Sequence, residues 1–157
     1  MTNVSSTYWI LVADSGHARI LRLRKKPREF HQVQELVSES RHLTSRDMVS
    51  DASGRAFHVK GPSSHSKRQR SDPHDQAEQA FSRMLVGKLE KAANLKAFEH
   101  LILIADPKTL GRVRQHMSKS LSGMVTNELN LDVVGLPLDS LQKKVWSLLN
   151  WPQSFSP

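Results

Sequence analysis

Three short segments near the start of the chain have the apolar patterns of β-strands. Tyr8–Ala13 is a continuous apolar run, which is typical of a buried strand, and turn-forming residues follow it. Apolar and basic residues then alternate over His17–Arg24, where adjacent Ile20 and Leu21 predict a β-bulge. Phe30–Val37 alternates again. Three consecutive strands with short connections predict an antiparallel meander.

Helical and strand patterns alternate in the second half of the chain. Asp72 fits an N-cap and Pro73 fits the first helical position, so a helix is expected to begin there. The elements expected from this point are a helix from Pro73 to about Leu95, a buried strand over Phe98–Ala105, a helix from Pro107 through Leu121, a strand over Met124–Val133 and a helix from Pro137. The order predicts an α/β fold with a mixed sheet, in which an antiparallel three-strand meander is followed by αβαβα. The ribonuclease H-like architecture has this order.

The length of 157 residues predicts a single domain over residues 1–157. Periodicity fails between Ser38 and Ser71, and a connection of that length is either functional or disordered. Within it, Ala52–Ser71 is expected to be a flexible basic loop, because it has few apolar residues to bury. The tail after Trp151 is expected to be frayed.

The composition excludes several classes of protein. The chain has no cysteine, so disulfides, cysteine-based zinc sites and thiol nucleophiles are absent. Its apolar runs are far shorter than the ~20 residues of a membrane span, and its start lacks the basic and apolar parts of a signal peptide. We therefore expect a cytoplasmic protein without membrane insertion and without a cofactor.

Positive charge is the strongest compositional feature. The formal net charge is +8, and three stretches without any acidic residue, Ser15–Arg28, Ala52–Ser71 and Pro107–Asn127, hold six, five and four Lys or Arg residues. Charge of this kind bears on partners rather than on fold, and a polyanion is the first partner to consider. Nucleic acid ranks ahead of a membrane surface.

Two of these stretches supply the candidate RNA-binding residues. They are Arg55, Lys60, Lys67, Arg68, Gln69 and Arg70 in the expected loop, and Lys108, Arg112 and Arg114 in the second helix. The alternatives are a solvated linker and an ordinary exposed helical face. Only one aromatic residue, Phe57, lies in the basic loop. Binding should therefore follow backbone and shape, and no DNA sequence specificity is expected.

Carboxylates give an enzymatic alternative. In the expected fold, Asp14 ends the first strand, Asp106 ends the fourth strand and Glu78 lies in the first helix. Ribonuclease H-like nucleases hold Mg²⁺ with carboxylates on comparable elements, and paired metal ions cleave phosphodiesters there. The structural alternative is that Asp14 shapes a turn, Asp106 caps a helix and Glu78 is an exposed helical residue. The histidines are scattered and form no metal-binding set.

Three motifs in series resemble a known family. They are Ala13–Ile20, Arg46–Asp51 closing with Gly54 and Arg55, and a run that starts at Asp72 and Pro73, passes through Ala77, Glu78, Phe81 and Phe98–Ala105, and ends on Pro107, Leu110 and Gly111. Their order and spacing resemble the bacterial host attachment protein family, described as required for attachment to host cells. The resemblance covers nearly the whole chain.

That family is similar in turn to the middle domain of archaeal and eukaryotic class-one peptide release factors and of Pelota. In release factors, a Gly-Gly-Gln loop before the long first helix promotes peptidyl-tRNA hydrolysis. The matching stretch here is Lys60–Ser71, where Lys67 and Arg68 rather than two glycines precede Gln69. The resemblance implies the scaffold and a ribosomal or RNA partner, without peptidyl-tRNA hydrolysis.

Three functional hypotheses follow. The first is a non-enzymatic module that binds ribosome-associated RNA or tRNA. The second is an accessory protein for attachment to host cells or surfaces, which binds protein or anionic polysaccharide. The third is a metal-dependent nuclease. The sequence leaves the oligomeric state open.

Overall fold

Five strands form one mixed sheet in a computed structural model that describes residues 7–25, 28–39 and 73–149. Their order across the sheet is β3-β2-β1-β4-β5. The elements are β1 (Tyr8–Ala13), β2 (His17–Lys25), β3 (Arg28–Val37), α4 (Pro73–Asn94), β4 (His100–Ala105), α5 (Pro107–His116), α6 (Lys119–Ser122), β5 (Val125–Asn130) and α7 (Leu138–Leu149). The predicted α/β class and mixed sheet are confirmed.

The first three strands form the predicted antiparallel meander. β1 pairs with β2, and β2 pairs with β3, both antiparallel. Asp14 closes the first turn because its Oδ1 atom accepts hydrogen bonds from the amides of Gly16, at 2.9 Å, and His17, at 2.7 Å. This bonding of an Asp side chain to the following backbone is what the turn sequence predicted.

A shift of register between β2 and β3 lies at Ile20 and Leu21, where the bulge was predicted. Ile20 is opposite Gln34 and Leu21 is opposite Gln32, so Val33 of β3 is the extra residue. The adjacent apolar pair in β2 has a separate cause. Ile20 faces one core of the protein and Leu21 the other, because β2 is buried on both faces.

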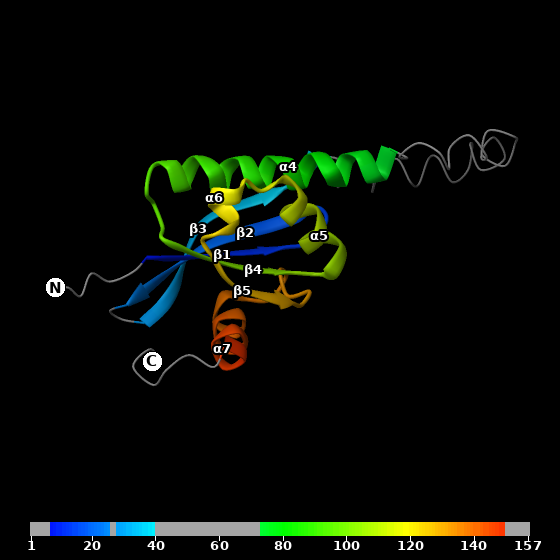
Figure 1. The fold of residues 1–157 in the computed structure, drawn as a ribbon. Coiled ribbons are helices and arrows are strands. Elements are labelled where there is room, and N and C mark those ends of the chain that lie inside the picture. Colours follow the sequence, from blue (N-terminus) through cyan, green and yellow to red (C-terminus); the bar gives the residue numbers. More distant parts are fainter. Residues whose placement is uncertain (1–6, 26–27, 40–72, 150–157) are drawn as a thin grey trace, which may run out of the picture.

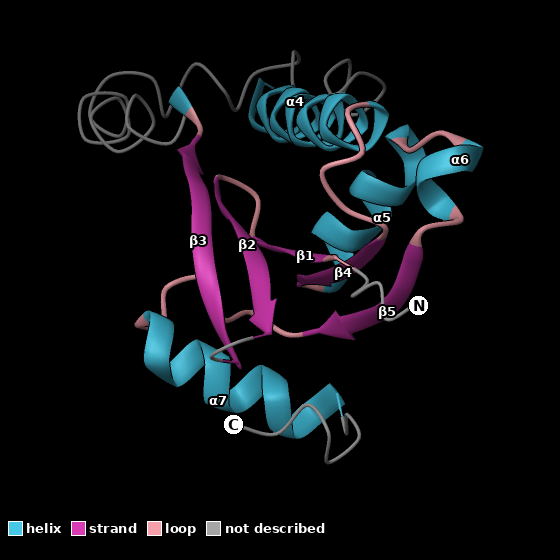
Figure 2. Cartoon of the chain, turned by 90° about the vertical axis from the view of Figure 1, so that its left-hand side faces the viewer, coloured by secondary structure: helices cyan, strands magenta, loops and turns pink. Residues whose placement is uncertain are grey.

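Helices cover both faces of the sheet. β1, β4 and β5 are parallel neighbours, with Ala13 opposite Ala105 and Ala105 opposite Asn130. Figure 2 shows α4, α5 and α6 on one side of the sheet and α7 on the other. α4 is the longest helix of the described part and lies along the outside of the molecule, as Figure 1 shows.

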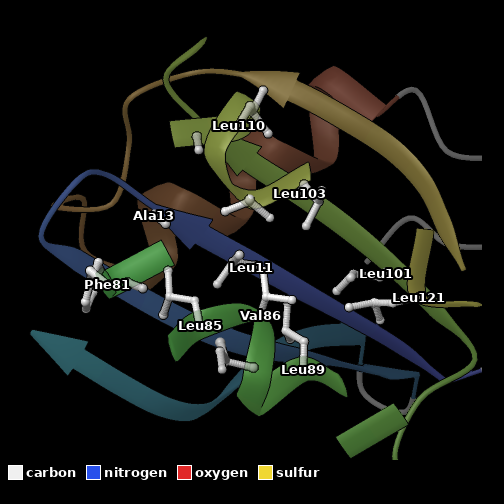
Figure 3. Close-up of a cluster of buried hydrophobic side chains, with 14 of the residues drawn as sticks. Leu11, Ala13, Phe81, Leu85, Val86, Leu89, Leu101, Leu103, Leu110 and Leu121 are labelled. Atoms are coloured by element: carbon white, nitrogen blue, oxygen red, sulfur yellow. The ribbon is translucent and has the colours of Figure 1, made fainter. Parts of the chain in front are cut away.

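The larger core lies between the sheet and α4, α5 and α6 (Figure 3). Leu85 and Leu89 of α4 are fully buried against Leu11 of β1 and Leu103 of β4. Burying a leucine side chain of this kind stabilises the fold by roughly 1.5–3 kcal/mol. The second core lies under α7, whose buried residues Leu141, Val145 and Leu149 follow one another at intervals of four residues.

The prediction of a single helix from Pro107 through Leu121 is wrong. α5 ends at His116, Met117 has an extended backbone, and α6 begins after Ser118. Ser118 caps α6 by accepting a hydrogen bond from the Leu121 amide at 3.0 Å. Capping by serine competes with continuing the helix, so the apolar stripe is divided between two helices. β5 is also shorter than predicted, since Val133 lies in the loop after it.

One arginine of the first basic stretch lies inside the protein. Arg19 of β2 is 8% exposed, and its Nη1 atom donates to the carbonyls of Val134, at 3.0 Å, and Leu136, at 2.5 Å. Its Nε atom donates to Gln32 Oε1 of β3 at 2.8 Å. Arg19 therefore holds the loop before α7 against the meander.

Among the described residues, no helix is both long and apolar enough to cross a membrane.

Replacing Arg19 with methionine should destabilise the protein, because the two carbonyls would lose their donor. We expect a loss of about 1–3 kcal/mol, the usual cost of a buried polar group left unsatisfied. The matched control is Arg22→Met at an exposed position of the same strand, which should cost much less. Urea denaturation measures both, and equal losses for the two variants would contradict the role given to Arg19.

Candidate nucleic-acid interface

The structure places three of the nine residues predicted to bind RNA. The other six, Arg55, Lys60, Lys67, Arg68, Gln69 and Arg70, lie outside the described residues. Lys108, Arg112 and Arg114 all lie on α5, as predicted, but they have different surroundings.

Arg112 is enclosed between α5 and the first turns of α4. Its side chain is 7% exposed, and its Nη2 atom donates to Asp75 Oδ1 at 2.5 Å. Its Nη1 atom lies 2.6 Å from Glu78 Oε1, in an ion-pair contact that lacks the angles of a hydrogen bond. Two carboxylates thus neutralise this guanidinium inside the protein, so we assign Arg112 a structural role.

Arg114 and Lys108 are more exposed than Arg112. The Arg114 guanidinium donates from Nη2 to Glu128 Oε1 at 2.7 Å, which ties α5 to β5. This hydrogen bond, with the attraction of the same carboxylate, raises the pKa of Arg114 above its ordinary value. Lys108 is 70% exposed and its Nζ atom lies 3.9 Å from Glu78. α5 therefore presents only Lys108 as a weakly paired cation.

Charge is segregated around α4. Its three carboxylates all have partners on α5 or in the turn before α6. Asp75 and Glu78 contact Arg112, and Glu90 accepts hydrogen bonds from the amide and hydroxyl of Ser118 at 2.8 and 2.9 Å.

The three cations of α4 are Arg83, Lys88 and Lys91, and all three are exposed. In the described part of the chain none of them forms an ion pair. At about 100° per residue they fall within an arc of about 140° on the outer side of the helix. Arg83 and Lys91 are about 12 Å apart along its axis. We call the side of α4 that carries Arg83, Gly87, Lys88 and Lys91 the outer basic face.

Gly87 lies at the middle of the outer basic face, one turn from Arg83 and one turn from Lys91. It is exposed, and a Cβ atom added to it would meet nothing within 4 Å. No close packing within the described structure requires glycine here. Glycine inside a helix costs about 1 kcal/mol relative to alanine, so this residue weakens the helix without a structural gain.

Sequence reasoning missed the outer basic face because it searched for stretches without acidic residues. α4 contains Asp75, Glu78 and Glu90, so its sequence reads as mixed charge. Sorting the charged residues by helical angle would have separated the two signs.

The three carboxylates of the nuclease hypothesis all make contacts within the protein. Asp14 and Asp106 follow neighbouring parallel strands, but Asp14 bonds its own turn and Asp106 Oδ2 accepts from the Thr109 amide at 3.2 Å. Glu78 contacts Arg112. Among the described residues, no three or more His, Asp or Glu side chains are grouped so that they could hold a metal ion.

An open groove lies between the end of β3 and the first turns of α4. Its lining is largely apolar and includes Val37, Ala77, Phe81 and Met84. The charged residue that lines it is Glu39. Met84 falls within the arc of Arg83, Lys88 and Lys91, so the groove borders the outer basic face but adds no cation to it.

A polar network joins the ends of β2 and β3. His17 Nε2 lies 2.5 Å from Glu35 Oε2, and Gln32 connects Glu35 to Arg19. The pKa of Glu35 is lowered, first by its hydrogen bond with His17 and further by the positive charge of Arg19. The network therefore holds the start of β2 against the end of β3.

A protein family described as "Protein required for attachment to host cells" matches residues 9–145. The chain belongs to this family. The match runs from β1 into α7 and confirms the predicted resemblance to this family.

Two similar proteins add little to the assignment of function. An uncharacterized protein of Rickettsia prowazekii (strain Madrid E) is 37% identical over 68 residues, which are 42% of this chain and 45% of that protein. The crystal structure of an archaeal translation termination factor aligns with 91% of this chain and 39% of its own, with a TM-score of 0.47 and 9% identity. The chain thus spans less than half of either protein.

Replacing Arg112 with methionine should destabilise this family member by about 1.5–3 kcal/mol, the usual worth of hydrogen bonds to charged groups. Arg114→Met is the matched control, since exposed ion pairs contribute only about 0–1 kcal/mol. Thermal and urea unfolding compare the two. If the Arg112 variant were as stable as the control, Arg112 would not be the internal tie between α4 and α5.

The carboxyl group of Glu35 should titrate at a lower pH than an ordinary glutamate, whose pKa is about 4.3. Because the pKa is lowered on folding, this group stabilises the fold above pH 4.3, and the contribution is lost as pH falls through the lowered value. His17→Ala should raise the Glu35 pKa, whereas the control His31→Ala on exposed β3 should not. Carbon-13 NMR titration measures the pKa of the Glu35 carboxyl group. An unchanged midpoint in His17→Ala would contradict the assignment of the lowered pKa to the contact with His17.

Proposed function

We propose that this chain is a non-enzymatic module that binds ribosome-associated RNA or tRNA through the outer basic face of α4. The observation that carries the proposal is the segregation of charge on that helix. Every carboxylate of α4 has a partner on α5 or in the turn before α6, while Arg83, Lys88 and Lys91 are exposed without an ion pair in the described part of the chain.

Unpaired cations of this kind suit a phosphate backbone. Lysine and arginine that contact phosphates release condensed counterions, which makes affinity depend steeply on salt. Arginine adds a planar fork that matches the geometry of phosphate oxygens. The net charge of +8 acts in the same direction by attracting a polyanion at long range.

Lys108 is a further candidate contact, since it is exposed on neighbouring α5. Arg112 and Arg114 are left out, because carboxylates of the protein already bind their guanidinium groups. A contribution from Lys67, Arg68 and Arg70 stays a prediction. A variant with all three charges reversed should weaken co-sedimentation with 70S ribosomes if these residues contribute, and unchanged co-sedimentation would remove them.

The description of the family supports a second candidate, an accessory protein for attachment that binds an anionic polysaccharide. Sulfate and carboxylate groups of such a polymer would attract the same cations. The two candidates differ in the ligand that binds the outer basic face most tightly, which is RNA for the first and an anionic polysaccharide for the second.

The test is sedimentation of the full chain with 70S ribosomes over a series of salt concentrations. We expect co-sedimentation at low salt that weakens as salt rises. The double variant Arg83→Glu with Lys91→Glu should lose it. The matched control is Lys143→Glu with Lys144→Glu on α7, which changes the net charge equally on the other side of the sheet and should keep it.

Equal losses in the two double variants would mean that total charge, rather than the outer basic face, causes the binding. No co-sedimentation at any salt concentration would remove the ribosome as partner. Retention on immobilised heparin that depends on Arg83 and Lys91, without binding to ribosomes, would favour the attachment candidate.

A further inference from the structure

We infer that the ligand of the outer basic face is double-helical RNA, and that one sugar–phosphate strand of the duplex crosses α4 over Gly87, between Arg83 and Lys91. This inference rests on the proposed function and adds the form of RNA and its point of contact. Two independent observations carry it: the surroundings of the aromatic residues and the exposed glycine.

Single-stranded RNA is bound largely by stacking its bases on aromatic side chains, which contributes about 1–3 kcal/mol per base. The described surface offers no such platform. Phe30, Phe81 and Phe98 are buried. The half-buried rings pack on neighbours within the fold: Tyr8 on His100 at 4.6 Å, Trp9 on Phe98 at 5.0 Å and Trp146 on Phe30 at 5.9 Å, between ring centroids. No aromatic residue of the described part is exposed.

The shape of α4 also favours double-helical over single-stranded RNA. α4 lies on the outside of the molecule (Figures 1 and 2). Because a helix is a cylinder, the outer side of α4 is convex. A convex helix cannot enclose a single strand, but it can lie against the wide and shallow minor groove of an A-form duplex. Such contacts are made to phosphates and 2′-hydroxyls and do not depend on base sequence.

Gly87 supplies the point of closest approach. Glycine is favoured where a ligand must come close to the backbone, because it has no side chain to hold the ligand away. Here the space above Gly87 is open, and the cations one turn before and one turn after it can each reach a phosphate of a strand lying between them. Lys88 lies beside the same crossing point.

The test compares binding of the full chain to a 20-base-pair RNA duplex and to each of its single strands, by fluorescence anisotropy over a salt series. We expect the duplex to bind at least about tenfold more tightly than either strand. Arg83→Gln and Lys91→Gln should each lower the slope of log affinity against log salt by about 1.

Gly87→Gln then tests the crossing point without a change of charge. Glutamine favours a helix over glycine, so this variant should fold at least as stably as the wild type. It should weaken duplex binding about tenfold. The matched control is Gly111→Gln on α5, where an exposed helical glycine has equally open surroundings, and it should bind normally.

The outcomes separate the inference from the proposed function. Binding to single strands as tight as to the duplex would overturn the choice of double-helical RNA while RNA binding stands. Normal duplex binding by Gly87→Gln, with weak binding by the Arg83 variant, would overturn the crossing point. If no form of RNA binds, the proposed function fails together with the inference.

Discussion

The central strands of this protein are buried on both faces, and this constraint determines the rest of the structure. β1 and β4 consist almost wholly of apolar residues, so each face of the sheet requires its own layer of helices. α7 supplies one layer, and α4 with α5 and α6 supplies the other. Because α4 spans one face, it must bury one side completely, and its polar residues divide between its flank and its outer side. The flank contacts α5 and the start of α6 through carboxylates, and the outer side keeps the cations.

Much of the fold was predictable because local patterns coincide with the final environment. The continuous apolar run of Tyr8–Ala13 marks a strand covered on both faces, and Pro73 is the first residue of α4 as predicted. The predicted N-cap, Asp72, lies outside the described residues. The division between α5 and α6 was not predictable from periodicity. It depends on Ser118, whose amide and hydroxyl are held by Glu90 from a helix almost thirty residues earlier in the chain.

The candidate site was harder to predict than the fold, since charge in a sequence does not state where a side chain points. Arg19 and Arg112 belong to stretches without acidic residues, yet both are buried and bonded inside the protein. Arg83 and Lys91 lie in a helix of mixed charge, yet they are exposed. The partners of Arg19 and of the carboxylates Asp75, Glu78 and Glu90 reveal this difference, and those partners lie on other elements.

The central claim is that the outer basic face of α4 contacts RNA. It is tested most directly by following the backbone amide signals of the isotope-labelled full chain in proton–nitrogen NMR spectra while an RNA duplex is added. The account predicts that, among the described residues, the largest changes occur in the exposed positions of α4 around Gly87, with small changes in α7. Changes centred on α7 or on the groove beside Val37, with the signals around Gly87 unmoved, would contradict it.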